Sequence, residues 1–408
     1  MAEYRTELRS AIGLALAGLI TLWAAVWNQF YSEWAYGRTA SKILILAAIV
    51  LGVAAMAIAG RQVNDEPRIP RTRGNVWILT VLLALHGLVA GWALSGAPPT
   101  VDCLSWQRDA VATLLQGRDP YGTSHANIYS AEAASRFYGP GTLVNGRVQV
   151  GLTYPPATLL VSIPGYLLGD VRYGYAAAIM LSAILVFALF PDERGLLVAA
   201  FILLAPTTFY VEYECWTEPL VWMLLCGTIY AAVKRPRWLP VALGLFLASK
   251  QYNFLAVPLI GYLVMPFNWK TALRLGASSL AIALATVLPF AIWDAHALWH
   301  DLYTFLSIVP VRQDALSFAI PFPIYARIGP LLLIGFMVWA IRREAKRPVM
   351  FAAGYGMALM LFFSASEQAF LNYYFLISFA LLLAAAGLWP QSFADKGSIP
   401  ERGFAANS

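Results

Sequence analysis

Long apolar segments separated by short polar ones dominate the chain and predict membrane-spanning helices. Backbone polar groups surrounded by lipid must be hydrogen-bonded within their own segment, which favours α-helices. The apolar runs are too long and unbroken for the alternating strands of a β-barrel. We therefore expect an all-α, polytopic integral membrane protein with about 12–13 transmembrane helices. The apolar segments lie at 11–30, 42–60, 76–94, 153–169, 173–190, 195–210, 216–233, 238–266, 271–293, 326–341, 349–364 and 370–389.

Basic residues mark one side of this membrane protein. By the positive-inside rule, short loops rich in Lys and Arg face the cytoplasm. Two long loops, 95–152 and 294–325, and two short segments, 206–218 and 364–370, then lie on the outer face. The basic clusters are Arg61, Arg68, Arg71 and Arg73; Lys234, Arg235 and Arg237; Lys270 and Arg274; and Arg342, Arg343, Lys346 and Arg347.

Two apolar segments depart from a simple crossing. Segment 238–266 begins and ends at cytoplasmic markers, so we expect a helical hairpin that turns near Lys250. Each arm has about 13 residues, or ~20 Å, which is shorter than a ~30 Å hydrocarbon core, so the turn should reach a cavity at membrane depth. Segment 153–169 should not cross, because crossings between two outer regions must be even in number and Pro155, Pro156 and Pro164 interrupt it.

Composition supports this class and excludes others. Hydrophobic residues make up 60% of the 408 residues, against about 45–50% apolar residues in soluble domains. The net charge of +6 comes from the basic loops and not from a basic stripe with interleaved aromatics, so nucleic acid is not an expected partner. Three cysteines are too few for a disulfide framework, although a bridge between Cys103 and Cys215 is left open.

Acidic residues gather on the predicted outer face. For most of them a solvated loop is the simplest interpretation. Glu212, Glu214 and Glu218 differ, because they stand in a very short segment at the start of a span, where ionisable groups usually face a polar cavity. Eleven of the 22 acids are external in this topology: Asp102, Asp109, Asp119, Glu132, Glu212, Glu214, Glu218, Asp294, Asp301, Asp314 and Glu367.

The first outer loop carries the strongest local pattern. Asp102 stands just past a span, and the amphipathic stretch from Leu104 to Gln116 predicts a helix lying on the membrane surface. This helix should end by Asp119, because a residue before proline avoids the helical region. The loop closes with Thr153-Tyr154-Pro155-Pro156.

This order of motifs resembles the polytopic, polyprenyl-phosphate-sugar-dependent glycosyltransferases of the GT-C superfold. Within it, the chain resembles glycosyltransferase family 87, which includes the α-mannosyltransferases of cell-envelope glycolipids. The resemblance covers residues 76–390, which leaves 1–75 as an N-terminal two-helix membrane extension and 391–408 as a cytoplasmic tail. The motifs are Gly117-Arg118-Asp119-Pro120-Tyr121-Gly122, Trp216-Thr217-Glu218-Pro219, Ala248-Ser249-Lys250, Pro310-Val311-Arg312-Gln313-Asp314-Ala315-Leu316-Ser317 and Gln368-Ala369-Phe370-Leu371-Asn372-Tyr373-Tyr374.

The resemblance implies transfer of one sugar from a polyprenyl-phosphate donor to a glycolipid or glycan acceptor. The sugar would be mannose or another hexose or pentose, and the active site would lie on the periplasmic or extracellular face of the bacterial plasma membrane. In such enzymes an acid of the first outer loop is the general base, and the matching residue is Asp102. A positioned carboxylate can take the proton of a weakly nucleophilic hydroxyl as an oxocarbenium-like carbon is attacked. Two alternatives are open: Asp102 caps the following helix, or Asp109, on the same helical face, is the base.

The leaving phosphate of such a donor needs positive charge. Lys250 at the hairpin turn and Arg312 in the second outer loop are the candidates, with Arg108 as a third. The competing interpretations are that Lys250 snorkels to the interface and that Arg312 is a solvated loop residue. Candidates for contact with the sugar or acceptor are Glu218, Glu214, Tyr154, Asn372 and Tyr373.

No metal ligand set is recognisable, so no cofactor is expected, although a divalent cation is left open because some enzymes of this superfold use one. His296 and His300 stand four residues apart, without a third ligand of clear spacing. A transporter or flippase of lipid-linked sugars is the alternative function. It would predict inverted repeats and charges at the bilayer midplane, and the sequence has no repeat and gathers its acids on one side. A non-catalytic envelope-assembly protein would leave those one-sided acids unexplained.

Overall fold

The computed structural model describes residues 2–31, 42–43, 45–53, 73–343 and 347–389. The expected all-α fold is confirmed, with one small exception in the first outer loop. There, strands β1 (His125–Ala126), β2 (Leu143–Val144) and β3 (Arg147–Val148) form an antiparallel sheet in the order β1-β3-β2. Arg61, Arg68 and Arg71 of the first basic cluster, part of the second apolar segment and the tail 391–408 lie outside the described residues.

Helices make up most of the described chain. Proline stands in the first turn of several of them, where its fixed φ suits a helix and its missing N–H costs nothing. The helices are α1 (Ala2–Tyr31), α3 (Arg73–Leu94), α4 (Asp102–Leu115), α5 (Ala131–Phe137), α6 (Pro156–Leu167), α7 (Arg172–Leu189), α8 (Glu193–Leu204), α9 (Pro206–Tyr213), α10 (Glu218–Lys234), η1 (Pro236–Trp238), α11 (Leu239–Leu247), η2 (Gln251–Leu263), α12 (Trp269–Trp299), η3 (His300–Thr304), α13 (Phe305–Ser307), α14 (Pro323–Arg342), α15 (Pro348–Ser364) and α16 (Leu371–Leu388).

Six helices of the described chain are long and apolar enough to cross a membrane, or seven if α8 and α9 count as one bent span. The bend between α8 and α9 is 46°. Other apolar segments fold as shorter helices, among them α6 and α15. The 12 residues of α6 are too few for a crossing, which agrees with the expectation that segment 153–169 does not span the membrane.

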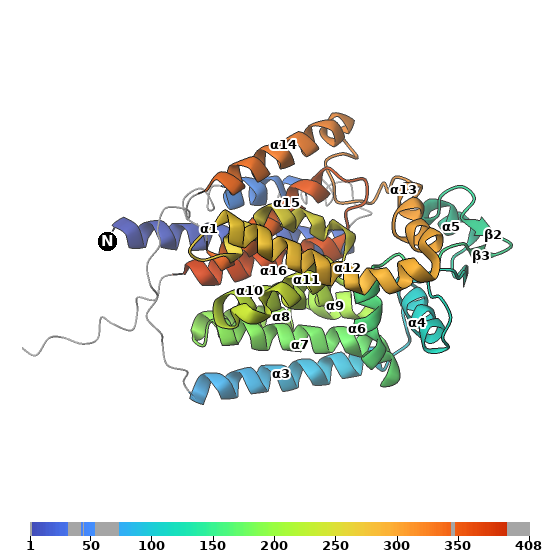
Figure 1. Ribbon diagram of the computed structural model, residues 1–408, viewed down its shortest axis with the longest axis horizontal. Coiled ribbons are helices and arrows are strands. Elements are labelled where there is room, and N and C mark those ends of the chain that lie inside the picture. Colours follow the sequence, from blue (N-terminus) through green and yellow to red (C-terminus); the bar gives the residue numbers. More distant parts are fainter. Residues whose placement is uncertain (1, 32–41, 44, 54–72, 344–346, 390–408) are drawn as a thin grey trace, which may run out of the picture.

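The two predicted outer loops meet at one end of the helix bundle. Figure 1 shows α4, α5, the small sheet and α13 together at that end, beyond the long helices. The second loop is more helical than expected, because α12 continues to Trp299 through a kink at Asp294 and is followed by a π-helical turn. Loops far apart in the sequence therefore share one face of the molecule.

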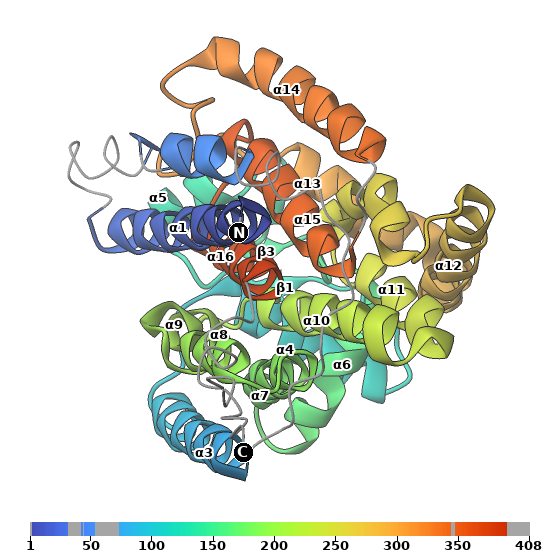
Figure 2. The same ribbon diagram turned by 90° about the vertical axis from the view of Figure 1, so that its left-hand side faces the viewer.

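The most buried of the six candidate spans lies at the centre of the bundle. α16 is buried on nearly all sides, packed against α1, α15, α10 and α8 (Figure 2). At its end the backbone approaches α15 so closely that a Cβ at Gly387 would lie 2.5 Å from Val349 Cγ1. By contrast, α3, α12 and α14 lie at the periphery with mostly exposed apolar side chains. Such exposed apolar helices fit a lipid environment.

The expected hairpin at 238–266 is broken where predicted, between α11 and η2. Its second arm is a 3₁₀ helix and not an α-helix. Pro258 lies within that arm and removes one backbone donor, which disfavours a regular α-helical ladder. Lys250 stands between the arms in an extended backbone conformation, so its side chain leaves the helical path.

A buried arginine fixes the helix ends below the outer loops. Arg172, at the start of α7, pairs with Asp170 at 2.6 Å and donates to the carbonyl of Leu94 at the end of α3 at 3.2 Å. Its guanidinium also lies 5.7 Å from the ring centre of Tyr213 at the end of α9. The ends of α3, α7 and α9 are thereby held together.

Candidate active site

Asp102 is the first residue of α4, at the end of the bundle where the two long loops meet. The alternative that Asp102 caps the following helix is wrong, because the helix begins at Asp102 itself and its N-cap residue is Val101, which makes no side-chain cap. The carboxylate accepts the N–H of Cys103 at 2.8 Å, and the backbone N–H of Asp102 donates to the hydroxyl of Tyr129 at 3.2 Å. An acid at this end of a helix is favoured by the helix dipole.

The surroundings of Asp102 make its carboxylate a stronger base than an exposed one. Burial raises the pKa of Asp102, and the N–H of Cys103 and the positive charge of Arg312 only partly oppose this increase. Desolvation disfavours the charged form of a carboxyl, whereas a nearby cation favours it. A raised pKa brings a carboxylate closer to the pH at which it must accept a proton.

Cys103 links Asp102 to a buried cation. Its Sγ lies 3.0 Å from the hydroxyl of Tyr154, and the ring of Tyr154 lies under the ammonium of Lys250 at 4.3 Å. This is a cation–π contact, which stabilises a lysine with little access to water. Cys103 and Cys215 are both free thiols, so the bridge left open by the sequence is absent.

Lys250 forms a closed pair with Glu218 and does not snorkel. The ammonium lies 3.1 Å from Glu218 Oε1 and also donates to the hydroxyl of Thr217. Lys250 is 6% exposed and Glu218 is fully buried. The same Oε1 accepts the hydroxyl of Tyr252 at 3.1 Å, while Oε2 is buried without a hydrogen-bond partner among the described residues. A buried acceptor without a partner is unusual in a folded protein, which makes this oxygen a candidate contact for a ligand hydroxyl.

The start of α16 reaches the same cluster. Tyr373 stacks on Phe363 with ring centres 4.0 Å apart and meets the ring of Tyr252 edge-on at 5.8 Å. Asn372 is buried beside it. Tyr154, Glu218, Asn372 and Tyr373, which the sequence suggested for sugar or acceptor contact, therefore surround Lys250 or its direct neighbours.

Arg312 brings the second outer loop to Asp102. Its guanidinium pairs with Asp314 at 2.6 Å and lies between two rings, 4.5 Å from the centre of Phe137 and 4.8 Å from that of Phe370. Its charge acts on Asp102. The backbone holding it is tied to the segment before α16 by a hydrogen bond from Gln368 to the carbonyl of Pro310 at 2.7 Å. Arg312 is thus a fixed, partly buried residue and not a freely solvated one.

Three sequence candidates lie outside this cluster. Asp109 pairs with His125 at 3.3 Å and with Arg108 at 3.1 Å. Burial raises the pKa of Asp109, but the hydrogen bonds from His125 and Arg108 outweigh it and hold this pKa below its usual value. Asp109 is therefore a weaker base than Asp102. Arg108 is mostly exposed on α4, where its guanidinium pairs with Asp109 and not with Asp102. Glu214 follows α9. Burial raises the pKa of Tyr129, and the negative charges of Asp102 and Glu214 raise it further.

Asp301 is a site residue that was not among the candidates suggested by the sequence. Its Oδ2 accepts the backbone N–H groups of Gly151 at 2.7 Å and Leu152 at 2.9 Å, and Gln251 donates to the carbonyl of Thr153 at 2.7 Å. Together they clamp the segment that carries Tyr154. In the sequence, Asp301 was marked only as one of the acids on the predicted outer face.

Replacing Asp301 by alanine should lower the free energy of unfolding by about 1–3 kcal/mol for each of the two backbone N–H groups left buried and unpaired. Transfer should fall too, because the segment that carries Tyr154 loses its anchor. Thermal unfolding of the detergent-purified chain measures the first effect. An unchanged unfolding temperature would contradict the clamp.

No group of three or more His, Cys, Asp or Glu side chains that could hold a metal ion occurs in the described part of the chain. His300 pairs with Asp301 at 2.9 Å.

The long apolar helices and their packing define a polytopic, all-α membrane protein. No family model and no curated protein sequence matches the chain. Among solved structures, the chain is similar to the crystal structure of ArnT from Cupriavidus metallidurans in the apo state, a GT-C membrane glycosyltransferase. The TM-score is 0.50 and the sequence identity 17%, over 78% of this chain and 60% of ArnT. The chain thus spans less than two thirds of the length of ArnT, and the likeness concerns the fold.

Proposed function

We propose that this protein is an integral-membrane glycosyltransferase that uses a lipid-linked sugar donor. In the specific form we favour, it moves one sugar, mannose or another hexose or pentose, from a polyprenyl phosphate to a glycolipid or glycan acceptor on the outer face of the plasma membrane. The observation that carries this proposal is the convergence of a base, Asp102, with two cations, Arg312 and Lys250, at one end of an apolar helix bundle.

The proposed reaction follows from these groups. Asp102 takes the proton of the acceptor hydroxyl as its oxygen forms a bond to the anomeric carbon. The bond from that carbon to the phosphate oxygen breaks, and the phosphate leaves with the electron pair as a stable anion. Arg312, and Lys250 once a phosphate competes with Glu218, would stabilise that anion. The free Oε2 of Glu218 would accept a hydrogen bond from a sugar hydroxyl.

The pKa shifts favour Asp102 over Asp109 as the base. Burial raises the pKa of Asp102, whereas hydrogen bonds from His125 and Arg108 outweigh burial and lower that of Asp109. Donors that stabilise the ionised form of a carboxyl make it a weaker base. Asp102 therefore suits the role of base better than Asp109.

The test is a transfer assay with the full chain in proteoliposomes. Radiolabelled polyprenyl-phosphate mannose and a matching pentose donor are incubated with envelope glycolipids as acceptors. Label that moves to an acceptor supports the proposal. Label that crosses the bilayer still attached to its polyprenyl phosphate, without acceptor labelling, supports the transporter alternative and contradicts the transferase.

One observation favours the transporter alternative, so the assay also measures whether the labelled donor crosses the bilayer. His86 on α3 and Glu212 on α9 form a buried pair, with Nε2 and Oε1 3.1 Å apart. Ionisable groups inside membrane proteins often mark a substrate or ion path. His86 also contacts the carbonyl of Leu203 through Nδ1 at 2.7 Å, which is consistent with a structural role at the bend between α8 and α9.

The pH dependence of transfer should report Asp102. The base must be ionised, so the rate should fall as the pH decreases through the raised pKa of Asp102. Because the charge of Arg312 lowers that pKa, the Arg312→Gln variant should move this acidic limb to higher pH, whatever it does to the maximum rate. Profiles of kcat/KM against pH test this, with Arg136→Gln, an exposed arginine of α5, as the control. A limb that stays in place or moves to lower pH in Arg312→Gln would contradict the assignment.

A further inference from the structure

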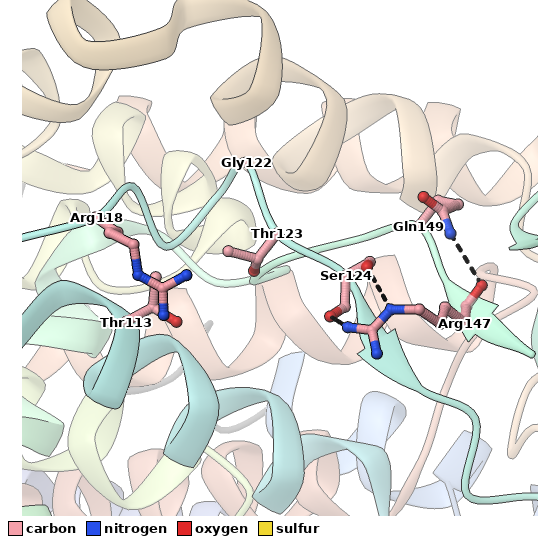
Figure 3. A pocket seen from close by; sticks show the side chains of 7 residues that line it. All are labelled: Thr113, Arg118, Gly122, Thr123, Ser124, Arg147 and Gln149. Carbon is pink, nitrogen blue, oxygen red and sulfur yellow. Dashed lines mark hydrogen bonds between the residues drawn. The ribbon is translucent and has the colours of Figure 1, made fainter. Parts of the chain in front are cut away.

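A polar cavity of about 460 Å³ opens in the first outer loop, apart from the cluster around Asp102. Its lining consists of two arginines, three hydroxyl side chains, one glutamine and one glycine. Figure 3 shows Arg118 beside Thr113 at one side of the cavity and Arg147 beside Ser124 at the other, with Thr123 between them. Both arginines are exposed to solvent.

The two arginines of this cavity carry uncompensated charge. In the described chain no carboxylate forms an ion pair with Arg118 or Arg147, whereas Arg136 and Arg312 each pair with an acid. Asp119 stands next to Arg118, but its Oδ1 accepts the backbone N–H of Tyr121 at 2.9 Å. The cavity therefore has a net positive charge and many hydrogen-bond donors, which suits a phosphate or carboxylate group.

Arg147 is held in place for such a role. Its Nε donates to the hydroxyl of Ser124 at 2.9 Å, and a second N–H donates to the carbonyl of the same residue. A guanidinium has five N–H donors, so others are left for a ligand. Arg118 donates to the side chain of Gln116.

The position of the cavity shows which anion it would take. Thr113 lies eleven residues after Asp102 on α4, on nearly the same helical face and ~16 Å further along the axis. The donor phosphate must be bonded to the carbon attacked beside Asp102, so it cannot also reach the cavity. The lining has no large apolar side chain that would accompany a lipid acyl chain.

We infer that this cavity, built around Arg118 and Arg147, binds an anionic group of the acceptor glycan, a phosphate or a carboxylate, at a distance from the reacting hydroxyl. The inference rests on the proposed function, because it assigns the cavity to the acceptor of that reaction. It also gives the acceptor a chemical class, an acidic glycan or glycolipid headgroup.

Binding can be measured without turnover. The full chain in phosphatidylcholine nanodiscs is titrated calorimetrically with mannose 6-phosphate, glucuronic acid and neutral mannose. We expect at least one acidic probe to bind more tightly than mannose, and Arg118→Gln to weaken that binding about tenfold, the loss of one charge-assisted hydrogen bond. Arg136→Gln removes the same charge outside the cavity and should bind as the wild type does.

The inference is overturned if neither acidic probe binds more tightly than mannose, or if Arg118→Gln and Arg136→Gln behave alike. Nanodiscs containing phosphatidylglycerol separate the sources of the anion: if only retention of this lipid depends on Arg118, the cavity holds a membrane headgroup and the acceptor assignment fails. Arg147→Gln is a second probe, although it also loses the contacts with Ser124. Binding that depends on Arg118 in a chain without transferase activity would refute the proposed function alone.

Discussion

Replacing Asp102 by asparagine is expected to lower the rate of sugar transfer by about 10²–10⁴-fold, the usual contribution of a positioned general base. The asparagine amide cannot take a proton from the acceptor hydroxyl. Asparagine has the same size as aspartate, and its side-chain carbonyl oxygen can still accept the hydrogen bond from the N–H of Cys103. The start of α4 should therefore persist. Initial rates with labelled polyprenyl-phosphate sugar measure the effect, and the unfolding temperature checks that the fold is intact.

Two further variants test whether the loss of transfer is specific to Asp102. Asp109→Asn changes the rival acid of the same helix and should lose less than about tenfold, since its carboxylate already pairs with His125 and Arg108. Glu132→Gln makes the same chemical change at an exposed position of α5 and should transfer at the wild-type rate. Unchanged transfer by Asp102→Asn, or a larger loss in Asp109→Asn, would remove Asp102 from the role of base.

Replacing Lys250 by methionine should both destabilise the protein and weaken transfer. The change leaves Glu218 buried without its cation, and breaking such a pair costs about 3–5 kcal/mol of unfolding free energy. Loss of a phosphate contact should reduce transfer by about ten- to a hundredfold. Thermal unfolding and donor-dependent kinetics measure the two effects separately.

The double variant Lys250→Met with Glu218→Gln separates a structural role of Lys250 from a functional one. With both charges gone, most of the lost stability should return, because no uncompensated charge is left in the buried site. Transfer should stay low with a raised KM for the donor, since neither the cation nor the carboxylate is restored. Recovery of transfer together with stability would reduce the Lys250–Glu218 pair to a structural element.

Local patterns predicted several elements well. The apolar segments and the basic loops predicted the helices and the grouping of the two long loops on one side, because lipid burial and loop charge act within single segments. The break at Lys250 was predicted because segment 238–266 begins and ends at basic cytoplasmic markers. The start of α4 was misplaced by two residues, since an acid near a helix start suits both the cap and the first turn.

Local sequence patterns could not predict which side chains far apart in the sequence contact each other. Nothing in the segment around Lys250 shows that its ammonium meets Glu218 and the ring of Tyr154, and nothing around Arg312 shows its place between Phe137 and Phe370. Asp109 and Asp102 are equivalent in helical spacing, yet burial raises the pKa of Asp102, whereas at Asp109 the hydrogen bonds from His125 and Arg108 outweigh burial and lower it. Asp301 looked like any outer acid until its contact with Gly151 and Leu152 was known.

The sequence by itself determined that this chain is a helical membrane protein, which segments are apolar and on which side its acids should gather. These properties depend on short-range free energies of transfer and on charge in single loops. Only the tertiary structure decided that Lys250 is neutralised by Glu218, that Arg312 rather than Arg108 lies near Asp102, and that Arg118 and Arg147 line one cavity. Those contacts join residues tens to hundreds of positions apart, and their geometry is fixed by how whole helices pack.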